Sequence, residues 1–346
     1  MNWGVNKMNI LVDTYNLAYQ ANAGGVQTKI EDYYRNIALC NDIVIKKFDK
    51  YQDKVGDFDI LHIFKFTTDS YELVRYAKTQ GLKIVISAVM PKLSKFKICL
   101  AKILNKFGVN TNYSMYNNML MLADAISVET DYEKKLIRTA FGIKDNKIHI
   151  IPNIVDVRNI EKNYDKSSIL KYNLPSKYVL QIGRIDANKN QLNIIRALKG
   201  KGIPVVFIGG GETLLSEYYE KCKKEADDNF YFLGWIPHDS AEFATILKNA
   251  DTVILPSFNE TFGIALIEAC LLNKKVACSK SLPILCYKIL QSVPTFDPNN
   301  LNDISNTIKN IFSSNYTSID YNSVFGVDAT CAKNICMYKE LLKSEK

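Results

Sequence analysis

Two glutamates stand at either end of a segment that passes from a polar loop into an apolar run. Glu260 and Glu268 are separated by seven residues within PSFNETFGIALIEA, residues 256–269, directly after the apolar run DTVILP. The spacing predicts a strand, a loop and then a helix that begins at Thr261–Gly263. A helix start offers unpaired backbone N–H groups and the positive end of the helix dipole. We therefore expect an anion site here, although a pair of glutamates alone is also typical of a helix cap and a solvated helix face.

Two cations follow a second apolar run. Arg184 and Lys189 come just after YVLQIG, residues 178–183, and before LNIIRAL, which has helical spacing. A planar guanidinium and a compact ammonium group are both suited to the oxygens of a diphosphate. Two basic residues in a loop are more often solvated surface, so the interpretation depends on both motifs together. The combination predicts a diphosphate site assembled from two loops that each follow a strand.

These motifs resemble those of the retaining glycosyltransferases with the GT-B fold, specifically family 4 (glycosyl transferases group 1). The resemblance rests on three features of the sequence and covers most of the chain in the right order: Gly183-Arg184 with Lys189, the pair Glu260 and Glu268, and IPNIVD at Ile151–Asp156. It departs from the family at Ile154, where a glycine is usual, and after the apolar run KIVISAV, where Ser87 or a neighbour occupies the position of a histidine. That second departure leaves the group that activates the acceptor unidentified.

The resemblance implies roles for individual residues. The catalytic residues would be Arg184, Lys189 and Glu260, with Glu260 on the hydroxyls of the transferred sugar. Glu268 would contact the ribose, and other contacts to the nucleotide sugar would come from Gly24, Gly25, Gly183, Trp235, Ile236, Thr261, Phe262 and Gly263. The family uses no metal or other cofactor for this step, because cations and helix N–H groups stabilise the departing diphosphate. Asp57 and Asp59 are spaced like a metal-binding pair, but they precede the apolar run ILHIF, so we assign them a structural role.

The order of elements predicts an α/β protein with two Rossmann-like, doubly wound parallel-sheet domains that face each other across a cleft. We place the acceptor-binding domain at residues 1–165 and the nucleotide-sugar domain at residues 166–325, with the polar run Lys162–Ser168 between them. Residues 326–346 should form a helix that returns to the first domain. Asn110–Tyr116 is polar and reads as a loop, and His62 reads as a packed core histidine.

Composition excludes several other classes of protein. The chain has 346 residues, 47% hydrophobic and 23% charged, which is typical of a globular protein large enough for two cores. Its eight cysteines form no CxxC pair and it has only three histidines, so neither a disulfide framework nor a zinc site is indicated. The glycine pair Gly24-Gly25 is not a GxGxxG, which argues against a dinucleotide-dependent dehydrogenase. No run is long enough to span a bilayer and none resembles a signal peptide, so we predict a cytoplasmic location.

Positive charge is concentrated in one part of the sequence. Residues 73–123 contain eight lysines and arginines and no acidic residue, against a net charge of +8 for the whole chain. Within this stretch, residues from Lys92 to Phe107 have apolar side chains at helical spacing with lysines on the flank. Such a helix is suited to the inner face of an anionic membrane, and the alternative is an ordinary helix packed on a sheet. We predict peripheral membrane association and no binding to nucleic acid, since no recognition module accompanies the charge.

The function implied by the resemblance is transfer of a hexose, with retention, from a nucleoside diphosphate sugar to an acceptor. A UDP-sugar is favoured over a GDP-sugar as donor. The basic segment suggests a membrane-associated, lipid-linked saccharide as acceptor, in the synthesis of a bacterial surface polysaccharide. Two alternatives stay open: a GT-B sugar-nucleotide epimerase, and a non-catalytic subunit that binds a sugar nucleotide for a partner transferase.

Overall fold

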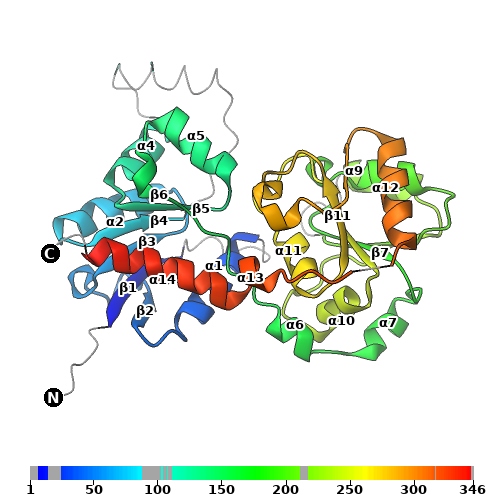
Figure 1. Ribbon diagram of the computed structural model, residues 1–346, viewed down its shortest axis with the longest axis horizontal. Helices are drawn as coiled ribbons and strands as arrows, with labels where there is room; N and C mark the ends of the chain where they lie inside the picture. The colour runs from blue at the N-terminus through cyan, green and yellow to red at the C-terminus, as the bar shows by residue number, and fades with distance from the viewer. Residues whose placement is uncertain are drawn as a thin grey trace. The chain divides into compact units, whose positions relative to one another are not determined.

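The chain forms two units, each built around its own parallel sheet (Figure 1). The computed structural model describes residues 7–14, 25–87, 103, 107, 111–210, 217–315 and 317–343. Unit 1 comprises residues 1–154 and 327–346, and unit 2 comprises residues 155–326. The prediction of two doubly wound domains is therefore confirmed.

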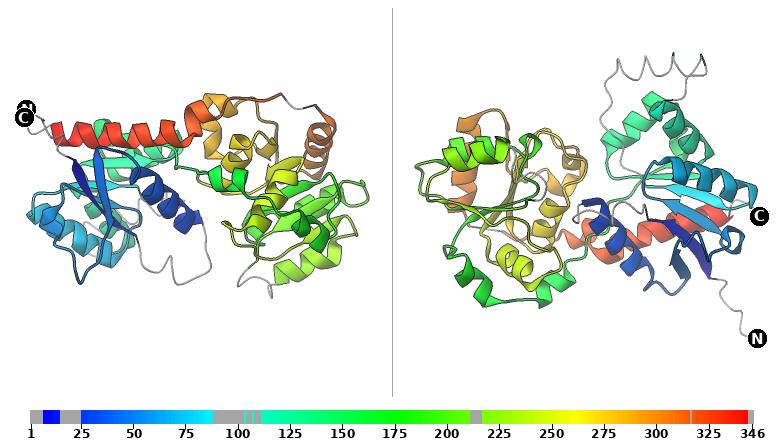
Figure 2. Two further views of the ribbon diagram at one scale, coloured as in Figure 1. Left: turned by 90° about the horizontal axis from the view of Figure 1, so that it is seen from below. Right: turned by 180° about the vertical axis from the view of Figure 1, so that it is seen from behind.

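Unit 1 has a six-stranded parallel sheet in the order β2-β1-β3-β4-β5-β6. Its strands are β1 (Met8–Asp13), β2 (Ile43–Lys47), β3 (Ile60–Ile63), β4 (Lys83–Ile86), β5 (Ala125–Val128) and β6 (Ile148–Ile150). Successive side chains of a strand point to opposite faces, and the helices are divided accordingly. One face is covered by α1 (Gly25–Ile37) and α14 (Val327–Lys343), and the other by α2 (Thr68–Thr79), α4 (Asn112–Leu122) and α5 (Asp131–Phe141). Figure 2 shows α14 lying along the sheet of unit 1 beside α1.

Unit 2 repeats the plan with the sheet order β12-β11-β10-β7-β8-β9, again all parallel. Its strands are β7 (Val179–Ile182), β8 (Val205–Ile208), β9 (Phe230–Phe232), β10 (Thr252–Leu255), β11 (Lys275–Ser279) and β12 (Thr295–Phe296). Helices α8 (Gln191–Leu198), α9 (Glu217–Glu225) and α12 (Leu301–Ser313) cover one face. The other face is covered by α6 (Arg158–Lys162), α7 (Lys166–Lys171), α10 (Ala241–Asn249), α11 (Ile264–Leu271) and α13 (Asn322–Phe325).

The first domain boundary lies earlier than the sequence suggested, at residue 154 rather than 165. The physical reason is α6, which packs on α10 and contributes Ile160 to the core of unit 2. The second boundary lies between residues 326 and 327, and α14 belongs to unit 1. The polar run Lys162–Ser168, predicted as a linker, instead includes the start of α7, where Asp165 caps the helix by accepting from the Ser167 N–H.

The expected loop at residues 110–116 is wrong from Asn112 onward, because α4 begins there. Thr111 accepts from the backbone N–H of Ser114, and the Ser114 hydroxyl accepts from the backbone N–H of Thr111. This capping box satisfies two backbone donors that the helix start would otherwise leave unpaired. A run of polar residues thus marks a helix start here rather than a loop.

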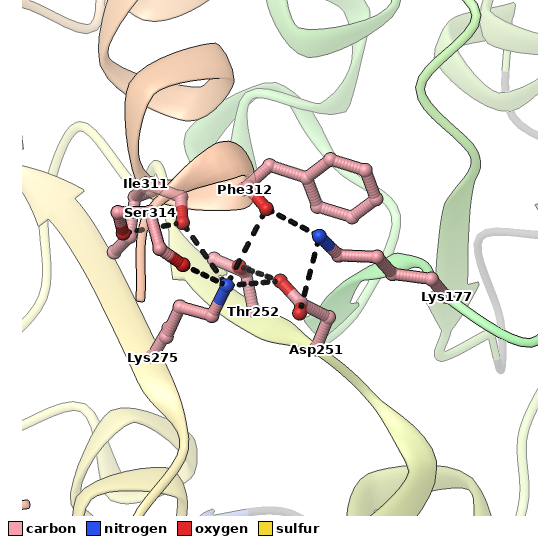
Figure 3. A network of polar contacts seen from close by, with 7 residues as sticks. All are labelled: Lys177, Asp251, Thr252, Lys275, Ile311, Phe312 and Ser314. Atoms are coloured by element: carbon pink, nitrogen blue, oxygen red, sulfur yellow. Dashed lines mark hydrogen bonds and ion pairs between the residues drawn. The ribbon is translucent and has the colours of Figure 1, made fainter. Parts of the chain in front are cut away.

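A polar network joins four segments of unit 2 at the amino ends of its strands (Figure 3). Asp251, just before β10, forms ion pairs with Lys275 at 3.1 Å and with Lys177 at 3.6 Å. Both lysines also donate to carbonyls at the last turn of α12, with Lys177 2.6 Å from the Phe312 oxygen and Lys275 2.9 Å from the Ser314 oxygen. Cations are favourable at a helix C-terminus, so the network ties α12 to the sheet.

Asp59 has the structural role that the sequence suggested. Its carboxylate accepts from the backbone N–H of Asn9 at 2.7 Å, at the edge where β1 and β3 begin. The predicted basic membrane helix, Lys92 to Phe107, lies outside the described residues except for Ile103 and Phe107. Over the described ranges, no helix has the length and apolar character needed to cross a membrane.

Candidate active site

The candidate site of unit 2 lies where the strand order of its sheet reverses. Strands β7 and β10 are hydrogen-bonded neighbours, but the chain leaves them toward opposite edges of the sheet. The loops beyond the carboxyl ends of two such strands diverge and leave a crevice, which is the usual ligand site of open α/β sheets. Here these loops carry the residues singled out in the sequence, Arg184 and Lys189 after β7 and Glu260 after β10.

The structure brings Lys189 and Glu260 into direct contact. The Lys189 ammonium group donates to a carboxylate oxygen of Glu260, and both side chains are about four-fifths buried, 18% and 21% exposed. Arg184 is different, since its side chain is 73% exposed and lies 3.4 Å from the Asp186 carboxylate. One cation of the loop is therefore partly buried beside a carboxylate, and the other is largely exposed to solvent. Of the three predicted catalytic residues, two are therefore in contact and the third lies on the same loop.

Two asparagines that sequence reasoning missed join the loops. The Asn188 side chain donates to the Asn259 carbonyl at 2.9 Å and accepts from the Asn259 N–H at 3.0 Å. Asn190 is buried in a left-handed conformation, with φ of 63°, and donates to the carbonyls of Pro256 and Pro298. Asparagine adopts this conformation more readily than most residues. These amides hold the Lys189 loop against the Glu260 loop.

Glycines allow the backbone to pass closely at the ends of β7, β8 and β10. Gly209 has φ of 146°, and a Cβ there would lie 1.9 Å from the Gly183 carbonyl oxygen. Gly263 has φ of 77° and caps α11, where a Cβ would lie 2.5 Å from the Leu255 side chain. The helix thus begins at Ile264, slightly later than expected, and directs its first N–H groups toward the loop that carries Glu260 and Thr261.

Glu268 is buried on α11, and its carboxylate contacts Nε2 of His238, a residue that the sequence analysis did not select. His238 lies in the loop after β9, close in sequence to Trp235 and Ile236, two of the predicted nucleotide-sugar contacts. Of these, Trp235 is 44% exposed, whereas the Ile236 side chain belongs to the apolar core. Phe262 is likewise buried and packs edge-on against Phe325. Any ligand contact of Ile236 or Phe262 would therefore come from the backbone.

Gly24 lies outside the described residues, and Gly25 is the first residue of α1. Unit 1 also has a small open pocket of its own, at the carboxyl ends of its strands. Its polar lining consists of Lys29, Tyr33, Ser87, Ser127, Asn153 and Asn334. Asn153 comes from the IPNIVD segment, and Ser87 directly follows β4.

Residues 164–322 match the model of the family described as Glycosyl transferases group 1. The similarity to the group 1 glycosyltransferases thus lies in unit 2. The matching range contains Arg184, Lys189, Glu260 and Glu268, and nearly coincides with unit 2. A protein described as an uncharacterized 41.2 kDa protein in the cps region of Klebsiella pneumoniae is 29% identical over 167 residues, which make up 46% of this chain and 44% of that protein. The match thus spans less than half of that relative's length.

Solved structures confirm the GT-B fold over nearly the whole chain. Sucrose-phosphate synthase from Thermosynechococcus elongatus aligns with a TM-score of 0.72 at 16% identity, covering 98% of this chain and 100% of that one. Anabaena HepE in complex with UDP-glucose aligns with a TM-score of 0.62 at 14% identity, covering 97% and 99%. At such identities the likeness concerns the fold alone.

Proposed function

We propose that the protein is a retaining hexosyltransferase that uses a nucleoside diphosphate sugar, with UDP favoured as the nucleotide. The observation that carries the proposal is the convergence of Lys189, Glu260 and the α11 N-terminus at the point where the sheet order reverses. The family of unit 2 supports transferase chemistry, and a neighbour of the same fold is described in complex with UDP-glucose.

The reaction breaks the bond between the anomeric carbon of the sugar and a phosphate oxygen, so negative charge develops on the departing diphosphate. Arg184 and Lys189 would neutralise that charge, and the first N–H groups of α11 would donate to it. Lys189 contacts Glu260 in the free protein. A bound diphosphate would compete for that ammonium group, leaving the Glu260 carboxylate to accept from hydroxyls of the sugar. Glu268 would hold the ribose.

No covalent intermediate is required by this arrangement. We propose front-face attack, in which the acceptor hydroxyl approaches on the side of the leaving group and passes its proton to the departing phosphate oxygen. The new glycosidic bond then keeps the anomeric configuration of the donor. Charge stabilisation comes from the protein's own cations, so we propose that donor binding needs no metal.

For the acceptor we propose a membrane-associated, lipid-linked saccharide of a bacterial surface polysaccharide. The acid-free stretch of residues 73–123 supports association with an anionic inner membrane face. The similarity to a protein in a Klebsiella pneumoniae cps region supports the polysaccharide context.

Donor protection tests the proposal. Thermal unfolding would be followed for the wild type, Arg184→Ala and Lys189→Met with UDP-glucose, UDP-galactose, UDP-N-acetylglucosamine and GDP-mannose, with and without EDTA. A donor at about 100 times its Kd should add about 2.7 kcal/mol to the free energy of unfolding. Both variants should lose this gain. Lys201→Ala is the matched control, because Lys201 is exposed in the turn that precedes β8, at the opposite end of the sheet.

The same donors separate the alternatives. A transferase should convert the stabilising donor only when a membrane lipid extract is supplied, and release UDP. An epimerase would convert the donor without any acceptor. If a donor binds and neither reaction occurs, the non-catalytic subunit is favoured, and if no donor stabilises the wild type, the proposed function is wrong.

A further inference from the structure

His238 lies in a short turn between β9 and α10 that is fixed by hydrogen bonds and by packing. The Ser240 hydroxyl donates to the Pro237 carbonyl at 2.7 Å and accepts from the Phe243 N–H at 3.1 Å, which caps α10. The imidazole ring packs against the buried Phe243 ring, with 4.7 Å between the ring centroids. Ile236, two residues earlier, belongs to the apolar core. These contacts give the imidazole of His238 a defined position.

The partner of this imidazole is a carboxylate inside an apolar helix. Glu268 is the one acidic residue of α11, IALIEACL, and its side chain is 3% exposed. A buried carboxylate is stable only where hydrogen-bond donors replace water. Over the part of the chain that the structure describes, the donor found for it is Nε2 of His238. A carboxylate has no proton to give, so Nε2 carries the proton of this contact whether the ring is neutral or charged.

The contact leaves the carboxylate able to accept further hydrogen bonds. A carboxylate has two oxygens and about four lone-pair sites, and His238 contacts one oxygen, Oε1. The side chain of Glu268 would otherwise turn about three bonds, and ordering it when a ligand binds would cost conformational entropy. Because His238 is itself held in place, the carboxylate is ordered before any ligand arrives.

The place of Glu268 on α11 relates this carboxylate to the proposed diphosphate site. The helix begins at Ile264, and Glu268 follows four residues later, about 6 Å along the axis at ~1.5 Å per residue. In a nucleoside diphosphate the ribose is joined to the phosphates through a single C5′–O5′ link. A diphosphate held by the first N–H groups of α11 would thus have its ribose at a distance comparable with this offset. Ribose hydroxyls can donate, and a carboxylate accepts such bonds strongly.

We propose that His238 is a positioning residue for ribose recognition. It holds the Glu268 carboxylate so that this group accepts from the ribose hydroxyls of the donor nucleotide and selects ribonucleotides over deoxyribonucleotides. The proposal rests on the proposed function for the presence of a nucleotide in this site and for the contact of Glu268 with its ribose. It adds to that site a residue 30 positions away in the sequence, on a different loop.

Ribose discrimination measures this role. Isothermal titration calorimetry would give the ratio of the Kd of 2′,3′-dideoxy-UDP to that of UDP, with the guanosine pair used instead if only GDP binds. Loss of a charge-assisted hydrogen bond predicts a ratio of about 10 or more in the wild type and a much smaller one in Glu268→Gln. His238→Phe keeps a ring against Phe243 but has no donor, so its ratio should fall to about 2 or less. His238→Gln, whose Nε2 can donate, should keep most of the wild-type ratio.

Two controls separate positioning from a general loss of structure. Inorganic diphosphate has no ribose, so its Kd should be the same in the wild type, His238→Phe and His238→Gln. Asp239→Asn is the matched control variant, because Asp239 is the exposed neighbour in the same turn, and it should keep the wild-type ratio.

The contact can also be followed in the unaltered protein by nitrogen-15 NMR. The chain has three histidines, and the His238 signal is the one that His238→Gln lacks. We expect a protonated Nε2 in the wild type without ligand. Its resonance should move on addition of UDP, and less on addition of 2′,3′-dideoxy-UDP or diphosphate. An unprotonated Nε2 would overturn the proposal, even where a variant fails to fold.

The outcomes separate this inference from the proposed function. If the wild type binds UDP and His238→Phe keeps the wild-type ratio while Glu268→Gln loses it, the inference is wrong and the proposed function stands. A loss of affinity in His238→Phe that is equal for UDP, its dideoxy form and diphosphate shows a purely structural role and also overturns the inference. If the wild type binds neither UDP nor GDP, both proposals are wrong.

Discussion

Glu133 should make the stability of unit 1 depend on pH in an unusual direction. It lies in the first turn of α5, 3% exposed, and its carboxylate accepts from the Glu129 N–H at 3.0 Å. Burial and, to a lesser extent, the nearby Glu129 carboxylate raise its pKa from 4.5 to about 7. Each unit between the folded and unfolded pKa values is worth about 1.4 kcal/mol, so the two states differ by about 3 kcal/mol.

The sign follows from where the proton is held. Below pH 4.5 the carboxyl group is protonated in both states. Between about 4.5 and 7 the unfolded chain gives up its proton while the folded protein keeps it, so the free energy of unfolding falls as pH rises. Above about pH 7 the carboxyl group is ionised in both states, and the free energy of unfolding falls no further. Glu133→Gln should remove this dependence and gain up to about 3 kcal/mol relative to the wild type between pH 4.5 and 8.

Urea unfolding of both proteins across this range measures the difference, with hydrogen exchange of residues 125–150 assigning the transition to unit 1. Titrations common to both proteins cancel in the comparison. Glu72→Gln serves as control, since Glu72 is 66% exposed, and its difference from the wild type should stay nearly constant. A Glu133→Gln difference that varies by less than about 0.5 kcal/mol, or that shrinks as pH rises, would refute the reasoning.

Three further predictions concern unit 2. Gly209→Ala should lower the free energy of unfolding of unit 2 by about 1–3 kcal/mol more than Gly200→Ala does, since both glycines have positive φ but a Cβ at Gly200 meets no atom within 4 Å. Urea titration compares the two variants. Equal losses of stability would contradict the close approach of Gly209 to the Gly183 carbonyl. Asp251→Asn should lower the free energy of unfolding by about 1–3 kcal/mol, because Lys275 loses its carboxylate partner. Thermal melts measure the loss, and an unchanged melting temperature would show that α12 is held in place without this ion pair. His238→Ala should lower the free energy of unfolding by a similar amount, because it removes the imidazole that contacts the buried Glu268 carboxylate. If calorimetry finds no change in the stability of unit 2, His238 has no structural role.

The sequence was sufficient to predict the candidate site of unit 2 because its residues follow strands in parallel sheets. In such sheets the carboxyl ends of neighbouring strands meet at one edge, so two loops that are distant in the chain converge. Strand positions and loop chemistry therefore predict Lys189 and Glu260 in one site, and the two side chains are in contact in the structure. Local spacing was also enough for the final helix, which was predicted within residues 326–346 and is observed at Val327–Lys343.

What the sequence did not indicate depends on pairs that only the fold brings together. Asn188 and Asn259 join across 71 positions, and His62 and Tyr338 across 276. Each residue alone has an ordinary structural explanation. The prediction of His62 as a packed core residue is confirmed by its complete burial, but its pairing with Tyr338 had no signal in the sequence. The start of α4 was missed for a different reason, because a capping box is built from the same polar residues as a loop. The spacing of Thr111 and Ser114, which together form the capping box, was the local feature from which the start of α4 could have been predicted.

The return of α14 to unit 1 has a consequence for how the protein is made. Unit 2 is a continuous stretch, whereas unit 1 needs residues 327 onward in addition to its first 154. A ribosome releases the chain from its N-terminus, and domains fold as their sequence becomes complete. The unit that emerges first must therefore wait for the unit that emerges second. Until α14 arrives, His62 and Tyr33 lack Tyr338, and the face of the sheet beside α1 stays without that helix while residues 155–326 are synthesised.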